Sequence, residues 1–595
     1  MLTHGLSRKA SGVGLAAHPK FSNILMKKYK ITGLAAYLLI LSSCSDSFLD
    51  LTPQGQLVGS QLNSPDGVEQ LLIGAYGMLN GNRSGTWGNY ASAPSQWLLG
   101  EVTSDNAHKG SNSADITTMN DLERFVPNST NDNLETLWNR CYEGVLSCNS
   151  VLRAVETLQS GSGQKLDPQR ATEIIAEARM LRAHYYFFLR RVFVNVPYID
   201  ENTSTPDAAV TPNDTDIYPK IQEDLEFAVA NLPTNKPKGD VGRVNKIAAQ
   251  AYLGKVLLYQ NKHAQALPLF ETVMASLPDL TGIPFENNFQ TETENGPESV
   301  FAVQHAIAGS VVDNANVGDM LGGYYGSAPV TCCGFYQPSI DLVNAFKVNE
   351  NGLPYLDNSY RNNTYSSDLL LPGDKSSFVL DKSIRFDPRL DYTVARRGVK
   401  FRDWGVMPGD GWIRDPAFGG PFLAQKHTIN LSEFGTQTVP GQEYVTGLNV
   451  NLIRLADVYL MAAECLIEGG DLVKAMGLIN KVRERASKLP KKKAADDTDA
   501  ANYQIGLYTA FTDKEHALRA VRFERRLELA LEGHRFYDLV RWGIAKEVIE
   551  SYSAYEGEYL PAYRDIKFNN FNNYFPIPQS QLDRSSGALK QNDGY

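Results

Sequence analysis

Glutamates and arginines alternate along one segment of the chain, which makes it the first candidate for catalysis. The segment runs from Val521 to Gly543 and reads VRFERRLELALEGHRFYDLVRWG. Glu524, Glu528 and Glu532 are four residues apart, so they would form one stripe of a helix. A glycosidase places an acid and a base or nucleophile on either side of one bond, usually from different elements. A row along one helix is better explained by ion pairs with arginines three or four residues away. We therefore predict a structural role for this stripe.

The rest of the sequence contains no catalytic or metal-binding motif. It lacks G-x-S-x-G, H-E-x-x-H, G-x-x-x-x-G-K-[ST] and a G-x-G-x-x-G after a predicted strand. His184 and His534 have no partner at catalytic or metal spacing. No C-x-x-C pair, Cys/His cluster or aspartate-rich loop suggests zinc or calcium. We expect no catalytic residue, no bound metal and no cofactor.

Five cysteines beyond the N-terminal region are predicted to be buried thiols. Cys141 and Cys148 lie seven apart in a helical pattern, hence about 10 Å apart along the axis, too far for a disulfide. The adjacent Cys332 and Cys333 could form only a strained ring, and Cys465 has no cysteine nearby in the sequence.

Aromatic residues in loops rich in glycine and asparagine are the other candidates for chemistry. The predicted binding residues come from GTWGNYASAPSQWLLGE and GGYYGSAPVTCCGFYQPS; they are Trp87, Tyr90, Trp97, Tyr324, Tyr325 and Tyr336. A sugar ring packs its flat C–H face on an aromatic ring, while polar side chains bond its hydroxyl groups. The alternative for each ring is that it fills the core beneath a loop. Glycines on both sides of Tyr324 and Tyr325 favour binding for that group. Trp404 and Trp412, in FRDWGVMPGDGW, form a third aromatic loop.

The sequence predicts helices on which these aromatic loops would be mounted. Apolar residues recur with helical spacing from Leu134 onward, and a second helix is predicted over Thr172 to Phe193, before Asn195-Val196-Pro197. Between Lys246 and Pro278, Leu253-Gly254, Ala266, Phe270 and Pro278 match the tetratricopeptide spacing. A degraded second copy places Ala463, Ala475 and Ile479 at equivalent positions. The alternative is an ordinary helical hairpin at each place.

Between these two repeats, roughly residues 281–450, glycine, proline, asparagine and aromatic residues become more frequent. A short helix is expected at Ile340 to Phe346, and short strands at SVFAVQ and LDYTVARRG. The predicted fold is all-α: a tetratricopeptide-like helical repeat scaffold with an inserted loop-rich region containing short strands. Its predicted parts are an N-terminal helical part (44–280), the insertion (281–450), which is predicted to be the ligand face, and a C-terminal helical part (451–595).

The N-terminal region reads as a targeting segment. Lys27, Lys28 and Lys30 precede the apolar run Ile31 to Leu41, which is too short to span a membrane and is typical of a signal peptide. Residues 1–43 are therefore assigned as the signal peptide. Met26 stands where such a peptide normally starts, so residues 1–25 are open to the interpretation of a misassigned start. Leu41-Ser42-Ser43-Cys44 has the form of a bacterial lipobox, which predicts lipidation of Cys44; the alternative is a secreted protein with a stray thiol there. The net charge of −10 argues against a nucleic-acid partner.

Seven segments in order resemble the SusD-like (RagB/SusD) family of surface glycan-binding lipoproteins. They are Cys44 with SFLDLTPQGQL, LRAHYYFFLRRVFVNVPYI, PSIDLVNAF, FDPRLDYTV, NLIRLADVYLMAAEC, RFERRLELALEGHRFYDLVRWG, and YFPIPQSQLD with the terminal QNDGY. The resemblance implies a lipid-anchored protein on the outer membrane, facing the cell exterior. It also implies a SusC-like TonB-dependent transporter as partner and an oligosaccharide as ligand, captured for import and not cleaved.

Two functions are therefore open. The first is non-catalytic glycan capture for an importer. The alternative is a tetratricopeptide-type protein-interaction module, or a capture protein for a non-glycan nutrient such as a peptide. Burial of all the loop aromatics would favour the alternative.

Overall fold

The computed structural model describes residues 63–81, 89–308, 314–371, 373 and 375–595, which belong to one compact unit, Leu62–Tyr595. The signal peptide at 1–43, the lipidation of Cys44 and the binding role of Trp87 fall outside the described residues. No helix in the described part is long and apolar enough to cross a membrane.

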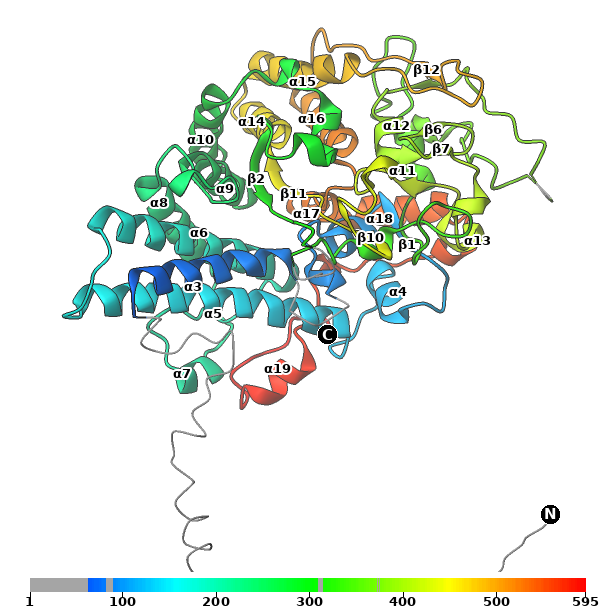
Figure 1. Cartoon of the computed structure of the whole chain (residues 1–595). Coiled ribbons are helices and arrows are strands. Elements are labelled where there is room, and N and C mark those ends of the chain that lie inside the picture. Colours follow the sequence, from blue (N-terminus) through cyan, green and yellow to red (C-terminus); the bar gives the residue numbers. More distant parts are fainter. Residues whose placement is uncertain (1–62, 82–88, 309–313, 372, 374) are drawn as a thin grey trace, which may run out of the picture. The chain divides into compact units, whose positions relative to one another are not determined.

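Helices supply most of the regular structure (Figure 1). The longer ones are α3 (Pro65–Gly77), α5 (Asp132–Ser160), α6 (Pro168–Phe193), α8 (Tyr218–Asn231), α9 (Lys246–Tyr259), α10 (His263–Ser276), α14 (Leu455–Glu468), α15 (Leu472–Ser487), α16 (Lys514–Leu529) and α18 (Ala545–Glu556). The shorter ones are α4 (Thr117–Glu123), α7 (Thr205–Ala209), α11 (Ile340–Ala345), α12 (Leu390–Thr393), α13 (Pro416–Gly419), α17 (Arg535–Arg541) and α19 (Gln579–Arg584). The predicted all-α fold is confirmed.

The boundaries of α6 show how the sequence sets a helix. Asp167 caps its start by accepting hydrogen bonds from the backbone N–H groups of Gln169 and Arg170, and Pro168 occupies the first turn, where it costs no hydrogen bond. The helix ends at Phe193 because Val194 takes a left-handed backbone with φ of 54°. The break falls just before Asn195-Val196-Pro197, as predicted.

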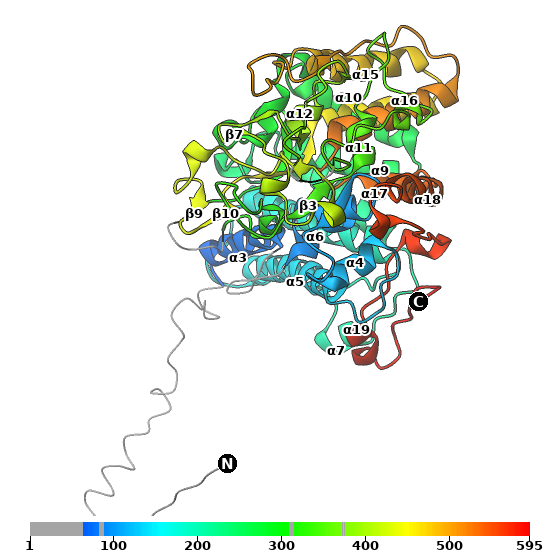
Figure 2. The same cartoon turned by 90° about the vertical axis from the view of Figure 1, so that its right-hand side faces the viewer.

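The long helices pack in sequence as an array. α5 packs on α6, α6 on α8, α8 on α9, α9 on α10, α10 on α14, and α14 on both α15 and α16. The hairpin α14–α15 therefore continues the array directly after α9–α10, although residues 277–454 separate the two pairs in the sequence. Figures 1 and 2 both place α15 and α16 at the opposite end from α3 and α5.

The residues of the repeat pattern lie where two helices meet. A Cβ built on Gly254 of α9 would come within 2.5 Å of the Phe270 ring of α10, so only glycine permits this approach. Ala266 and Phe270 are fully buried, and so are Ala463, Ala475 and Ile479 of the second pair. Small residues thus bring the helices together, as tetratricopeptide packing requires.

Short strand pairs hold the loop-rich segment together and join it to the rest of the protein. The strands are β1 (Ala107–Gly110), β2 (Ser299–Val303), β3 (Phe335–Pro338), β4 (Arg385–Phe386), β5 (Val394–Ala395), β6 (Lys400–Phe401), β7 (Gly405–Val406), β8 (Leu423–Ala424), β9 (Thr438–Val439), β10 (Gln442–Thr446), β11 (Val450–Arg454) and β12 (Asn502–Tyr503). Each pairs with one other: β1 with β3, β2 with β11, β5 with β8, β6 with β7 and β9 with β10 are antiparallel, and β4 with β12 is parallel. The β2–β11 ladder joins the two ends of the loop-rich segment next to α14.

The strand expected at LDYTVARRG is only partly present. Leu390–Thr393 forms the helical turn α12, and the strand β5 is confined to Val394–Ala395. The prediction was wrong in the first half because Asp387 starts a turn: its carboxylate accepts a hydrogen bond from the Arg389 N–H, and its carbonyl accepts one from the Leu390 N–H.

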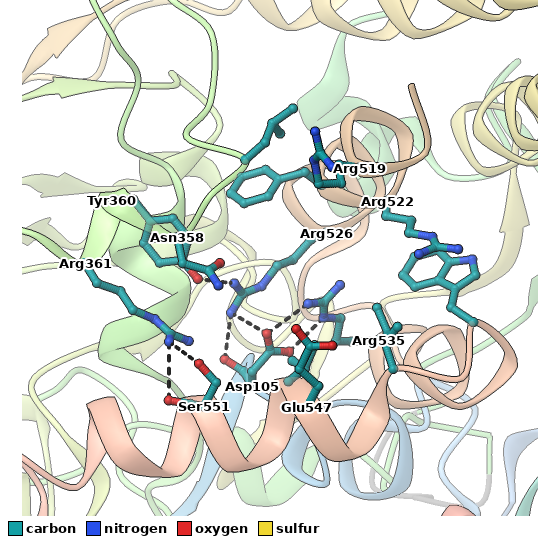
Figure 3. A pocket seen from close by; sticks show the side chains of 15 residues that line it. Asp105, Asn358, Tyr360, Arg361, Arg519, Arg522, Arg526, Arg535, Glu547 and Ser551 are labelled. Carbon is teal, nitrogen blue, oxygen red and sulfur yellow. Dashed lines mark hydrogen bonds and ion pairs between the residues drawn. The ribbon is translucent and has the colours of Figure 1, made fainter. Parts of the chain in front are cut away.

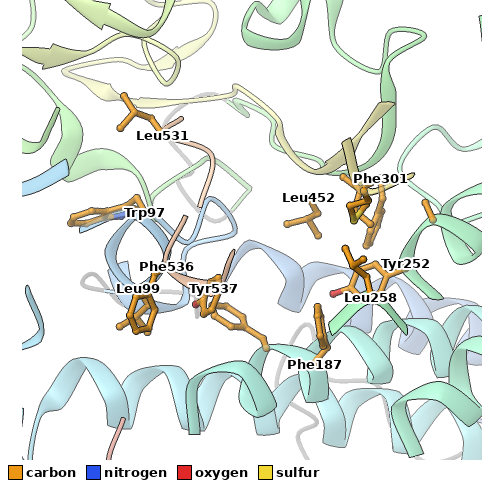
Figure 4. Packing of buried hydrophobic residues seen from close by; sticks show 14 of the residues in the cluster. Trp97, Leu99, Phe187, Tyr252, Leu258, Phe301, Leu452, Leu531, Phe536 and Tyr537 are labelled. Atoms are coloured by element: carbon orange, nitrogen blue, oxygen red, sulfur yellow. The ribbon is translucent and has the colours of Figure 1, made fainter. Parts of the chain in front are cut away.

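One hydrophobic core runs through the array and under the loops. Figure 4 shows Phe301 of β2 and Leu452 of β11 beside Tyr252 and Leu258 of α9, with Phe187 of α6 below them. The ring centroids of Phe187 and Tyr252 are 5.9 Å apart, and those of Tyr252 and Phe301 are 6.3 Å apart. The β2–β11 ladder is thus packed on the helices and not only joined to them.

Candidate functional site

Three of the aromatic residues predicted to bind a ligand are buried. Trp97 is 1% exposed, Tyr324 2% and Tyr336 3%. The indole N–H of Trp97 donates to the Gly318 carbonyl at 3.0 Å, and its ring lies 5.4 Å from the ring of Tyr336. The Tyr324 hydroxyl donates to the Ala424 carbonyl. These rings support the loops from below and offer no open face to a sugar in this structure.

Trp404 and Trp412, the third aromatic loop, pack around Tyr324. Their rings lie 5.4 and 5.9 Å from it, and Trp412 is 5% exposed. Together with Phe401 they form a small core inside the loop-rich segment. Glycine-rich aromatic loops here build their own core, because an insertion of this size has to bury apolar surface to stay ordered.

The other two described candidates reach the surface. Tyr325 is 39% exposed, and Tyr90 is half-buried. Arg414 places its guanidinium 5.2 Å from the centroid of the Tyr325 ring, a cation–π contact. Arg414 also donates to the carboxylate of Asp115 at 2.6 Å and to the Ser111 hydroxyl at 2.8 Å.

Tyr444 of β10 adds a third ring that the sequence analysis missed. Tyr90 and Tyr444 are both half-buried and pack against the same small apolar cluster around Val317 and Val445. Burial raises the pKa of Tyr90, and the neighbouring Asp115 carboxylate and Tyr444 hydroxyl raise it further. Glycines flank Tyr444 in GQEYVTG, which is the same signal that singled out Tyr325. We call Tyr90, Asp115, Tyr325, Arg414 and Tyr444 the loop surface.

The two adjacent cysteines lie in the loop that follows Tyr325. Cys332 and Cys333 form a disulfide and are half-buried, so the prediction of two buried thiols was wrong for this pair. Cys141, Cys148 and Cys465 are buried free thiols, as predicted.

Glycines let the chain fold closely around the disulfide. A Cβ on Gly323 would lie 3.2 Å from the Cβ atoms of both Cys332 and Tyr444. Gly334 has a φ of 75°, and a Cβ there would lie 3.1 Å from that of Arg414. The glycines around the paired tyrosines therefore place Tyr325, Arg414 and Tyr444 around one small area.

The loop surface has the groups that a saccharide site needs. Tyr325 offers a partly open ring, Arg414 offers guanidinium donors, and the partly exposed Asp115 carboxylate offers oxygen acceptors. Because Asp115 is already bonded to Arg414 and Ser111, it serves as a fixed hydrogen-bond acceptor. Among the described residues, no group of three or more His, Cys, Asp or Glu side chains could hold a metal ion.

The glutamate stripe is structural, but its ion pairs are not local. Glu524 and Glu528 are fully buried on α16, whereas Glu532 lies beyond the end of the helix at Leu529, so the predicted helical stripe holds for the first two glutamates only. Their partners come from other segments: Arg389 and Arg483 for Glu524; Arg389, Arg454 and Arg485 for Glu528; and Lys426 and Arg454 for Glu532. The prediction of pairs three and four residues apart was wrong, because this face of α16 turns into the protein and meets arginines there.

The arginines of the same helix face other carboxylates. Arg525 pairs with Asp457 of α14 and Asp538 of α17, and Arg526 pairs with Asp105 and Asp341. Although burial alone would raise the pKa of Glu532, the charges of Arg454 and Lys426 lower it to about 2. The ion pairs of this cluster join α14, α15, α16 and the loop-rich segment.

Two protein-family models match this chain. A family model described as "SusD family" matches residues 297–595, half of the chain, and one described as "Starch-binding associating with outer membrane" matches residues 47–258. The chain belongs to the SusD family. The first matched range ends near the end of α9, and the second begins just before β2 and contains it.

Relatives in the SusD family are similar over nearly the whole chain. A SusD-like protein of Bacteroides ovatus is 26% identical over 96% of this chain and 88% of its own length. SusD-like protein P25 of Formosa agariphila is 24% identical over 95% of this chain and 100% of its own length. A solved laminarin-binding SusD-like protein is 25% identical, with a TM-score of 0.61 over 89% of this chain and 100% of that one. Surface glycan-binding protein A of Bacteroides thetaiotaomicron, solved with laminarihexaose, shares the fold at 20% identity, with a TM-score of 0.62 over 89% and 99%.

Proposed function

We propose that this SusD-family chain captures an oligosaccharide at the loop surface without cleaving it. The observation that carries the proposal is the arrangement of Tyr325, Arg414 and Asp115, a partly open ring with a cation and an acceptor beside it. Family membership and the laminarin-binding relative support the choice of a glycan as ligand.

Affinity at such a site comes from several weak contacts. Stacking a sugar on Tyr325 costs little side-chain entropy, because the tyrosine ring is already held by Arg414 and by the loop around Gly334. Tyr90 and Tyr444 would contact neighbouring sugar units. Moderate affinity suits a protein that has to release its ligand to a transporter.

The predicted lipid anchor explains how the captured glycan would reach a transporter. Lipid on Cys44 would hold the protein on the outer membrane, facing the cell exterior, beside a SusC-like TonB-dependent transporter. Tethering raises the effective concentration of captured glycan at the pore mouth without any new contact. Import of the nutrient, the transporter partner and the orientation are parts of this proposal.

Binding and hydrolysis can be tested together. Residues 45–595 are titrated with laminarin and other polysaccharides by isothermal titration calorimetry, and reducing ends are assayed in the same mixtures. We expect binding without release of reducing ends. Tyr325→Ala should weaken binding about tenfold, because one aromatic contact with its burial is worth about 1 to 2 kcal/mol.

A matched control separates the site from general loss of aromatic surface. Phe571 is 36% exposed, close to the 39% of Tyr325, and lies outside the loop surface. Phe571→Ala should leave the affinity unchanged. Hydrolysis by the pure protein, or equal losses from Tyr325→Ala and Phe571→Ala, would contradict the proposal.

A non-glycan ligand is the second candidate, and the burial of Trp97, Tyr324 and Tyr336 favours it. With these rings below the surface, the open aromatic area is small, and the acceptors and the guanidinium of the loop surface would also suit a peptide. Binding of a peptide mixture, with no response to any polysaccharide, would establish it.

A further inference from the structure

A cavity of about 160 Å³ lies among α16, α17, α18 and the turn at Asn358–Arg361 (Figure 3). Arginines dominate its lining; they are Arg361, Arg519, Arg522, Arg526 and Arg535. The only carboxylates that line it are Asp105 and Glu547. The chain as a whole has a net charge of −10, so a cavity lined by five arginines is a marked local excess of positive charge.

Three of the arginines form a fixed floor. Arg526 and Arg535 both bond the Asp105 carboxylate, at 3.1 and 2.7 Å, and Figure 3 shows them converging on it. Arg361 pairs with the buried Asp341 at 2.7 Å and donates to the Ser551 hydroxyl. Asp341 also pairs with Arg526. Two carboxylates thus serve three guanidinium groups, so the floor keeps a positive charge.

The remaining two arginines stand one helical turn apart on α16. Among the described residues, no carboxylate lies within ion-pair distance of Arg522, and its Nε is buried without a hydrogen-bond partner. Its guanidinium lies 5.2 Å from the Trp542 ring. Arg519 has only a long, exposed pair with Glu515 at 3.6 Å, which contributes little.

The walls of the cavity are apolar, which strengthens its charges. Leu356, Phe523, Trp542, Ile544 and Val548 line it beside the arginines. Burial lowers the pKa of Arg522, as expected for a cation that has left water without gaining an anion. An oxyanion placed here would meet guanidinium donors in a site that is partly shielded from water.

We propose that this cavity binds an oxyanion group, either as a free sulfate or phosphate ion or as the carboxylate of an acidic sugar. The site is separate from the loop surface: the two share no residue, and Figure 2 shows α18 on one side of the unit and β9 and β10 on the other. The proposal therefore stands or fails independently of glycan capture at Tyr325. Arg522 is the residue that gains most, because the anion would supply its missing partner.

Thermal unfolding with matched salts tests the site and distinguishes the sources. The melting temperature of residues 45–595 is measured in sodium sulfate, sodium phosphate and sodium glucuronate, against sodium chloride of equal ionic strength and against glucose. An anion that binds the folded state should raise Tm by about 2 °C at ten times its Kd. A response to sulfate or phosphate alone indicates a free ion, and a stronger response to glucuronate indicates an acidic sugar.

Substitutions of the two arginines distinguish binding in the cavity from general effects of salt on Tm. Arg522→Met keeps the apolar stem over Trp542 and removes the unpaired cation, so Tm in chloride should rise while the anion-dependent increase disappears. Arg519→Met should weaken anion binding about tenfold, since charged hydrogen bonds are worth about 1.5 kcal/mol or more. Arg153→Met, an exposed residue of α5, is the control and should behave as the parent.

The proposal is overturned if none of the three anions raises Tm above chloride. It is also overturned if Arg522→Met and Arg519→Met keep the full increase, because the anions would then act elsewhere. Should Arg522→Met fail to fold, Arg519→Met carries the test by calorimetric titration with the same anions.

Discussion

At the scale of single residues, the buried ion pairs around α16 constrain the described structure. Glu528 accepts bonds from Arg389, Arg454 and Arg485, and all four side chains are at most 1% exposed. Charges buried this deeply are stable only when every partner is present, because an unpaired charge in the interior keeps its full desolvation cost.

Glu528→Gln should therefore destabilise the protein by about 3–5 kcal/mol, since it leaves buried arginines without their common anion. Urea unfolding followed by circular dichroism measures the change. Glu484→Gln is the control: its pair with Lys488 is about half exposed on each side, and its loss should change stability by less than about 0.5 kcal/mol. Equal effects of the two substitutions would contradict this account of the network.

The sequence predicts some of these residue contacts and misses those that depend on distant segments. The four-residue spacing correctly places Glu524 and Glu528 on one stripe of α16, although the helix ends before Glu532. The spacing cannot show that Arg389 and Arg454 approach from other segments. Composition likewise cannot separate Trp97 from Tyr325, because both sit beside glycine and proline. Which ring turns inward depends on distant contacts, such as the Gly318 carbonyl that accepts from Trp97.

At the scale of elements, the packing of α9 on α10 depends on Gly254. Gly254→Ala should destabilise the protein by about 1–3 kcal/mol, although alanine alone favours a helix over glycine by about 1 kcal/mol, because the new methyl group would overlap the Phe270 ring. Thermal unfolding measures it. Gly477 of α15 has no atom near its Cβ position, so Gly477→Ala should be stabilising. A stabilising Gly254→Ala would rule out the close helix contact.

A histidine joins β1 to α18. His108 is fully buried and bonds Glu556 at 2.8 Å, with Glu123 at 3.5 Å and the Tyr563 ring at 3.9 Å. Although burial alone would lower the pKa of His108, its bonds to the two glutamates raise it to about 9.

Because the folded pKa of His108 is above its unfolded value of 6.5, its stabilisation is fully present below pH 6.5 and is lost as pH rises through 9. The destabilisation caused by His108→Gln should thus be larger at pH 6 than at pH 9.5, by about 3 kcal/mol. Urea unfolding at both pH values measures the difference. The same cost at pH 6 and pH 9.5 would show that the histidine is neutral in the folded protein.

At the scale of the whole molecule, three buried histidines make the fold sensitive to acid. Burial lowers the pKa of His184 to about 3, of His305 to about 4 and of His534 to about 3, so each is neutral when folded. Their unfolded forms take up protons below pH 6.5, so their stabilising contribution is present above pH 6.5 and is lost as pH falls toward 4. Tm should fall over this range, and replacing all three with glutamine should flatten the slope. An unchanged slope in the triple variant would assign the acid sensitivity to other groups.

The order of the two helical repeats and the loop-rich segment between them were predictable from the sequence. Helical periodicity and the tetratricopeptide spacing led to the α9–α10 and α14–α15 pairs, and composition identified the loop-rich segment between them. Strand pairing was not predictable, because β1 and β3 are only four residues each and lie more than two hundred residues apart in the sequence. Pairs so short are fixed by the surrounding fold and leave no periodic signal.

The β2–β11 ladder has a consequence for how such proteins diversify. Because the two ends of the loop-rich segment are joined side by side, insertions and deletions within it leave the distance between α10 and α14 unchanged. The segments that carry Tyr325 and Tyr444 can thus change in sequence and length without altering the packing of α10 on α14. Under the proposed function, a change of ligand would therefore require changes in this segment and none in the helical frame.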